Sequence, residues 1–293
     1  MGSYVFFNFT SDEEALDNVK WVYLAIAIFV FILAFVFFLS TIPEITDADM
    51  AFQANESNAN ADDKPFWKQY RLFHATFAQF CYTGAQIAIA SFFINYVKET
   101  RSNTDDGLAS QFLAGAQGAF AVGRFFGVFL MKYLRPRKVF LVFLLACVVF
   151  ISPSITQREN TGMSMLYVTL FFESICFPTI VALGMRGLGR HTKRGSGFIV
   201  GGVVGGAVVP PLTGVAADAY ENTAPAMLVP LMFFIAALSY AVCVNFVPAY
   251  RDSADAFSET EIGLQGEAVD EEIAKGSVVA DEKAINDMEA DRK

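Results

Sequence analysis

The sequence predicts an all-α membrane protein with seven transmembrane helices. Of its 293 residues, 54% are hydrophobic and 31 are phenylalanine. These residues gather in long runs, and about 20 apolar residues in a helix cross the roughly 30 Å hydrocarbon core of a bilayer. The runs are too long and too uniformly apolar for the strands of a β-barrel, the other structure that satisfies its backbone in lipid.

Each run that is long enough is expected to form one helix. In chain order, the runs cover residues 21–42, 72–97, 108–131, 139–157, 163–185, 196–217 and 226–247. The four cysteines lie inside four different runs without the spacing of a metal site, so we expect neither a metal nor a cofactor.

Lysine and arginine residues in the connecting loops predict which side of the membrane each loop faces. The loops "KYLRPRK" and "RGLGRHTKRG" each contain four basic residues, whereas the intervening loops contain one or none. Short basic loops stay in the cytoplasm. The helices alternate in direction, so the loop before the second run and the C-terminal tail are expected there too, with the plasma membrane as the site.

These features divide the chain into four parts. Residues 1–42 are expected to form an external N-terminal remnant and the first helix, and residues 43–70 a cytoplasmic loop. A six-helix bundle follows at 71–248. Residues 249–293 should form a disordered cytoplasmic tail, because the chain from Pro248 onward holds thirteen acidic and five basic residues. The net charge of −9 is thus a property of the tail, and nothing suggests a nucleic-acid partner.

The helices after the first fall into two triplets of the same pattern. The second and fifth runs carry polar residues, the third and sixth carry small residues four apart, and the fourth and seventh are nearly featureless. This order predicts a helix that lines a pocket, a helix that packs closely and a helix that faces lipid. The packing glycines are Gly115, Gly123, Gly127, Gly197, Gly201 and Gly205.

Transporters are often built from such three-helix repeats. The first run is of the featureless kind, and it would complete an earlier triplet that this chain lacks. We therefore expect the chain to be the C-terminal part of a longer transporter, unable to accumulate substrate alone.

Polar residues of the second run are candidates for binding a sugar. Gln79, Tyr82 and Gln86 lie on a narrow face of the predicted helix, and Asn95 lies nearer its outer end. Amide and phenol groups exchange hydrogen bonds with hydroxyls without introducing charge, which suits a polyhydroxyl ligand. The alternative is that these side chains hold helices together.

Two charged residues and three prolines lie within the apolar runs. Arg124 and Glu173 are expected to form a buried ion pair, or Glu173 is expected to carry protons or contact substrate. Pro178, Pro210 and Pro211 are expected to kink their helices, either for movement or as static packing features.

Four segments resemble one known family in order along the chain. They are "FAQFCYTGAQIAIASFFINY", "GRFFGVFLMKYLRPRK", "ESICFPTIVALGMRGLGRHTKRG" and "GGVVGGAVVPPLTG". They are similar to the fucose:proton symporters of the major facilitator superfamily, a group that includes glucose/galactose transporters. The resemblance implies helices six to twelve of a twelve-helix fold, sugar and proton as partners, and alternating access between two halves. The best-known proton-coupling carboxylates of the family would lie in the half that is absent.

Other functions fit the sequence less well. A non-transporting remnant or sensor remains an alternative. A seven-helix receptor is disfavoured, because the last run has no lysine for a retinal Schiff base and the triplets fit a transporter. Catalysis is not expected, since the sequence shows no metal cluster, nucleophile–base pair or phosphate-binding loop.

Overall fold

The computed structural model describes residues 12–39, 65–102, 104–188 and 191–255, and every regular element within these ranges is helical. Within these ranges, six segments are long and apolar enough to cross a membrane. They are Tyr70–Thr100, Asp106–Tyr133, Pro136–Ser154, Glu159–Met185, Thr192–Tyr220 and Thr223–Phe246. The predicted all-α class is therefore confirmed, and the six later runs each correspond to one span.

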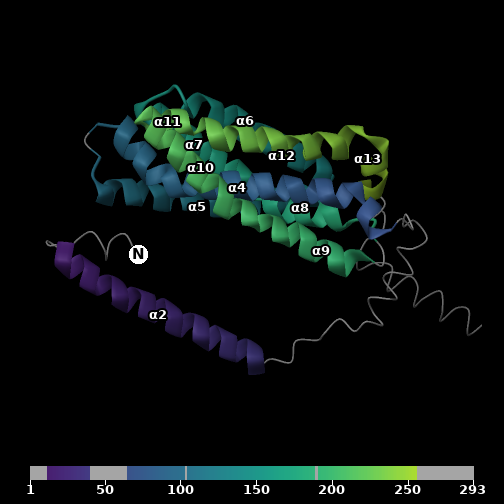
Figure 1. Cartoon of the computed structure of the whole chain (residues 1–293), viewed down its shortest axis with the longest axis horizontal. Helices are drawn as coiled ribbons and strands as arrows, with labels where there is room; N and C mark the ends of the chain where they lie inside the picture. The colour runs from purple at the N-terminus through teal and green to yellow at the C-terminus, as the bar shows by residue number, and fades with distance from the viewer. Residues whose placement is uncertain (1–11, 40–64, 103, 189–190, 256–293) are drawn as a thin grey trace, which may run out of the picture.

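The first predicted run differs from the other six. It lies in α2 (Asp12–Leu39), and residues 24–36, where the structure describes every side chain, are apolar. Figure 1 shows α2 apart from the bundle, and the side chains from Leu24 to Val36 are exposed.

Three spans are uninterrupted helices: α4 (Tyr70–Thr100), α5 (Asp106–Tyr133) and α6 (Pro136–Ser154). The other three consist of shorter elements in series. These are α7 (Glu159–Glu173) with α8 (Cys176–Met185); α9 (Thr192–Gly201) with the 3₁₀ turn η3 (Gly202–Val204) and α10 (Gly205–Tyr220); and α11 (Thr223–Ala226) with α12 (Leu228–Phe246). The 3₁₀ turn η1 (Phe66–Lys68) precedes α4, and α13 (Pro248–Asp255) ends the described chain.

The break between α7 and α8 has a cause in the sequence. Pro178 has no backbone N–H, so it cannot donate to the carbonyl of Ser174, which begins the two-residue break. The helical ladder resumes when the N–H of Thr179 donates to the carbonyl of Ile175 at 3.2 Å. In contrast, Pro210 and Pro211 lie inside α10, and the irregular turn of that span is η3, before them.

The helix α4 lies at the centre of the bundle. It packs most extensively against α10 and α12, and also contacts α5, α7, α8, α9, η3 and α11 (Figure 1). The most apolar stretch of α4 is 56% buried within the bundle, compared with 17% for that of α5. The helix that carries the candidate sugar-binding residues therefore has neighbours on nearly every side.

The expected division into packing helices and lipid-facing helices is wrong in one respect. The featureless spans, α6 and α11–α12, are each 44% buried, whereas the glycine-rich spans are only 17% and 28% buried. Large rings of the featureless helices, including Phe140, Phe143, Phe234 and Tyr240, fill the core. Apolar side chains pack into a core or face lipid equally well, so their pattern alone did not decide between these environments.

Several of the predicted packing glycines lie at close helix contacts. A Cβ on Gly205 would stand 2.0 Å from the carbonyl oxygen of Phe80 on α4. One on Gly123 would stand 2.3 Å from the carbonyl oxygen of Phe171 on α7, and one on Gly127 would stand 2.2 Å from Ile175. Real Cβ atoms do not approach so closely, so each position excludes a larger residue.

The other predicted glycines have more space. A Cβ on Gly115 would meet the flexible Tyr167 side chain at 2.8 Å, while Gly197 and Gly201 face open space. Glycine spacing thus marks close contacts on α5 and at the start of α10, but not along α9.

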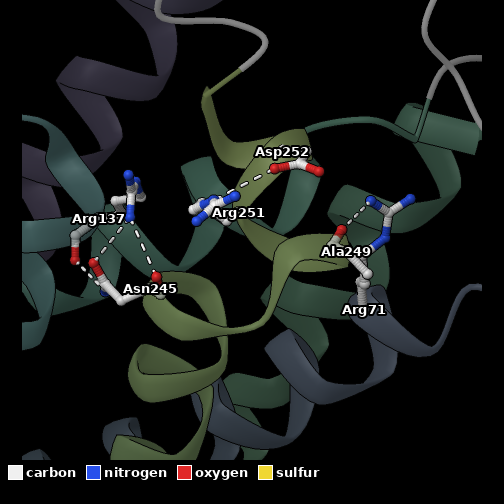
Figure 2. Close-up of polar contacts among 6 residues, drawn as sticks. All are labelled: Arg71, Arg137, Asn245, Ala249, Arg251 and Asp252. Carbon is white, nitrogen blue, oxygen red and sulfur yellow. Dashed lines mark hydrogen bonds and ion pairs between the residues drawn. The ribbon is translucent and has the colours of Figure 1, made fainter.

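The short helix α13 folds back onto the end of the bundle where α4 begins, as Figure 2 shows. Arg71 donates to the carbonyl oxygen of Ala249 at 3.0 Å. The Tyr250 hydroxyl lies 3.2 Å from Nδ1 of His74, and partial burial raises the pKa of this phenol above its ordinary value. Residues 249–255, predicted as disordered tail, are therefore helical, whereas the predicted tail from 256 and the predicted loop at 43–64 lie outside the described residues.

Replacement of Gly123 by alanine should destabilise the protein. The new methyl group would collide with the backbone of α7, which cannot rotate away as a side chain can, and the expected loss is about 1–3 kcal/mol in the free energy of unfolding. The matched control is Gly118→Ala on the same helix, where a Cβ meets nothing within 4 Å. Unfolding in detergent measures both, and equal stability of the two variants would contradict the close contact.

Candidate functional site

The candidate site is a cavity of about 450 Å³ between α4, α5 and the end of α7. Its polar lining comes from three helices. The helix α4 supplies Gln86 and Ser91, α5 supplies Gln117 and Arg124, and α7 supplies Glu173. The apolar lining is Ile87, Ala90, Leu113 and Phe120. The cavity thus offers two amides, a hydroxyl, a guanidinium and a carboxyl group next to one aromatic ring.

Of the four predicted sugar-binding residues, Gln86 is the one in the lining of this cavity. Gln79, two turns earlier on nearly the same face of α4, is fully buried and donates to Thr83 Oγ1 at 3.3 Å. Its neighbour across the contact is η3, since a Cβ on Gly202 would lie 3.1 Å from Cβ of Gln79. Asn95 is exposed further along the helix and outside the lining.

Tyr82 holds two helices together in this structure. It is fully buried, and its hydroxyl donates to the backbone carbonyl of Glu173 at 2.5 Å. That carbonyl belongs to the last residue of α7, just before the break in the helix, where the regular backbone partners end. Tyr82 therefore fixes the break relative to α4 and places the Glu173 side chain at the cavity.

Arg124 and Glu173 both line the cavity without forming an ion pair within 4.0 Å of each other. Glu173 is 1% exposed, and its Oε2 atom has no hydrogen-bond partner. Arg124 is exposed at the cavity, with its guanidinium carbon 4.9 Å from the centre of the Phe120 ring, a cation–π distance. The structure thus brings the two predicted residues to one site, but it does not pair them as the sequence predicted.

Gln117 and Phe120 are site residues that the sequence reasoning missed. Both lie on α5, which was interpreted as a packing helix because of its glycines. A detectable signal was present: Gln117 and Arg124 are seven residues apart, two helical turns, and so share a face of the helix. The ring of His74 joins α4 to α12, because its Nε2 atom lies 3.0 Å from the Ser239 hydroxyl, while its Nδ1 atom contacts Tyr250 on α13.

Comparison with known proteins finds related transporters. None of the protein-family models searched matches the chain. The L-fucose-proton symporter of Escherichia coli is 32% identical over 224 residues, covering 76% of this chain and 51% of that protein. The glucose/galactose transporter of Brucella abortus is 29% identical over 211 residues, covering 72% of this chain and 50% of that protein.

Solved structures give the same relationship. The crystal structure of a variant of the Escherichia coli fucose:proton symporter has a TM-score of 0.61 and 31% identity, covering 79% of this chain and 58% of that one. A peptide transporter crystallised with sulfate has a TM-score of 0.57 at 13% identity, which shows a shared fold alone.

The predicted resemblance is therefore confirmed. The chain has the fold of major facilitator transporters and is a relative of the fucose–proton symporters and glucose/galactose transporters. It is an integral membrane protein that crosses the bilayer several times. It spans about half the length of the curated relatives it matches.

Tyr82→Phe should destabilise the protein, because it removes the hydroxyl that bonds the Glu173 carbonyl. A buried carbonyl left without its donor costs about 1–3 kcal/mol in the free energy of unfolding. Thermal unfolding of purified protein provides the measurement, with Tyr133→Phe, the same change at an exposed tyrosine of α5, as control. A Tyr82 variant as stable as the Tyr133 variant would show that the bond contributes nothing.

Proposed function

We propose that this chain takes part in the transport of a neutral sugar across a membrane together with protons, and that the cavity between α4, α5 and α7 forms one wall of the sugar site. The observation that carries the proposal is the composition of the cavity. It places two glutamine amides and a serine hydroxyl beside an aromatic ring, inside segments that cross the bilayer.

The chemistry of the lining supports a polyhydroxyl ligand. A sugar that leaves water loses hydrogen bonds to its hydroxyls, and amides replace them because they both donate and accept. The ring of Phe120 offers an apolar surface against which the C–H face of a pyranose can pack. The cavity volume of about 450 Å³ lies within the usual range of small-molecule sites.

The relatives support the substrate class. The names of two of them specify L-fucose with protons, and glucose and galactose. Because this chain spans about half of each, we propose that the opposite wall of the site comes from a second six-helix unit, as in transporters that cycle by alternating access.

We also propose a plasma-membrane protein whose α13 end faces the cytoplasm. One end of the bundle, here named the basic end, carries most of the arginine and lysine residues. Among the described residues they are Lys68, Arg71, Lys132, Arg135, Arg137, Lys138, Arg186, Lys193, Arg194 and Arg251. The excess of basic residues in short loops on the cytoplasmic side supports this orientation.

The role of Gln86 can be tested by binding. Gln86→Ala should weaken the binding of L-fucose, glucose or galactose, whichever the purified protein binds, by about 1–3 kcal/mol, because sugar hydroxyls lose their partner. Equilibrium binding of labelled sugar to protein in lipid nanodiscs measures the change.

The control for Gln86 is Gln111→Ala, the same substitution at an exposed glutamine of α5 outside the cavity. It should leave affinity unchanged. Loss of affinity in both variants, or a Gln86 variant that binds normally but unfolds more easily, would show that the amide has a structural role. The predicted contribution of Asn95 can be measured in the same assay.

The orientation can be tested by labelling single cysteines introduced at exposed positions of opposite ends. A membrane-impermeant thiol reagent added to intact cells should modify Ser102→Cys, in the loop after α4, and spare Leu134→Cys, at the basic end. Permeabilised cells should show labelling at both positions. The reverse pattern in intact cells would invert the proposed topology.

A further inference from the structure

The carboxyl group of Glu173 is a buried acid whose role the sugar site leaves unexplained. Its side chain is 1% exposed within a membrane-spanning segment, and its Oε2 atom has no hydrogen-bond partner. An ionised carboxylate in such a place is costly unless a cation or several donors surround it. The arrangement around Glu173 therefore fits the neutral, protonated acid better than the anion.

The groups around Glu173 come from every helix that packs there. They are the phenol of Tyr82 on α4, the guanidinium of Arg124 on α5, and the thiols of Cys147 on α6 and Cys176 on α8. The Tyr82 hydroxyl already donates to the Glu173 backbone carbonyl. The Cys147 thiol donates to the carbonyl of Thr169 at 3.9 Å, and the Cys176 thiol donates to the carbonyl of Phe172 at 3.6 Å. Of these four groups, Arg124 alone carries a positive charge that a glutamate anion could pair with.

Arg124 lines the same cavity, and in this structure its guanidinium lies over the ring of Phe120. A permanent structural ion pair would place the two charged groups within 4.0 Å, which is not the case for these two residues. An arginine side chain is long enough to change its partner by rotation about its single bonds, without movement of the helices. Arg124 and Glu173 thus both line the cavity, and they are not paired with each other in this structure.

We propose that Glu173 is a proton-binding residue of this cavity and that Arg124 pairs with it only when the proton has left. When Glu173 is protonated, Arg124 is free to donate hydrogen bonds to a sugar in the cavity. When the carboxyl O–H bond breaks, its proton passes to water and the anion attracts the guanidinium away from the sugar. The part of this inference that concerns sugar rests on the proposed function, whereas the proton site does not.

Infrared spectroscopy of the 293-residue chain in lipid nanodiscs tests the proton site directly, with no sugar present. At neutral pH the wild type should show the carbonyl band of a protonated carboxylic acid, and Glu173→Gln should remove that band. If this variant does not fold, Glu173→Asp should instead displace the band. Absence of any protonated band that depends on residue 173 at neutral pH would overturn the proposal.

The partnership with Arg124 predicts a shift in titration. Arg124→Gln removes the partner of the anion, so the band should persist to a pH at least about one unit higher, a tenfold gain in proton affinity. Arg158→Gln, which removes an arginine bound to Asn222 far from the cavity, should leave the titration unchanged and serves as the matched control. A titration unmoved by Arg124→Gln would overturn the switch.

Added sugar separates this inference from the proposed function. If protonation frees Arg124 for the sugar, then by linkage saturating L-fucose or galactose should raise the proton affinity of Glu173 by about fivefold or more. Sugar that binds in a separate assay but leaves the titration unmoved overturns the coupling. If neither sugar binds while Glu173 still titrates with its dependence on Arg124, the proposed function fails and the proton site stands.

Discussion

The close backbone contact of α4 with the η3–α10 segment is the constraint on which the rest of the bundle depends. Gly202 and Gly205 bring two main chains so near that a Cβ at either position would overlap α4. Close packing contributes more to helix association in a bilayer than in water. Lipid tails are as apolar as leucine, so the hydrophobic effect does not drive helices together there. With α4 packed against α10, its remaining surface contacts α5, α7 and α12.

The cavity exists because the helix contacts around α4 differ with depth. At Gln79 the η3 turn packs closely against α4, whereas two turns later, at Gln86, α4, α5 and α7 enclose the cavity. The break after Glu173 lies next to this cavity, where α7 ends and its last carbonyl accepts a hydrogen bond from Tyr82. Pro178 thus accounts for a helix break beside a site that it does not itself line.

The sequence predicted the fold class, the six spans and three residues that line the cavity, Gln86, Arg124 and Glu173, and the reason is physical. Helical periodicity tells which residues share a face, so Gln79 and Gln86 were assigned together. It does not tell which neighbour covers that face at each depth, and the structure separates the two residues for this reason. Gln117 was not predicted because the glycines of α5 led to its interpretation as a packing helix. Glycine spacing identifies the face of a helix that approaches a neighbour closely, and it carries no information about the other faces. The burial of Phe140 and Phe234 in the core could not be predicted, because an aromatic ring is equally favourable in contact with lipid and in a protein core.

The contacts of α13 have a consequence for the order in which this protein can assemble. Arg71 stands at the start of the first span of the bundle, and its acceptor on Ala249 follows 178 residues later in the chain. Arg186 likewise donates to Ala254. Chains are synthesised from the N-terminus, so the contacts of Arg71 with Ala249 and of Arg186 with Ala254 form only after the last described residues have been made. Packing of α13 against the basic end is therefore a late event in the synthesis of the protein, and a chain that stops before α13 lacks both of these hydrogen bonds.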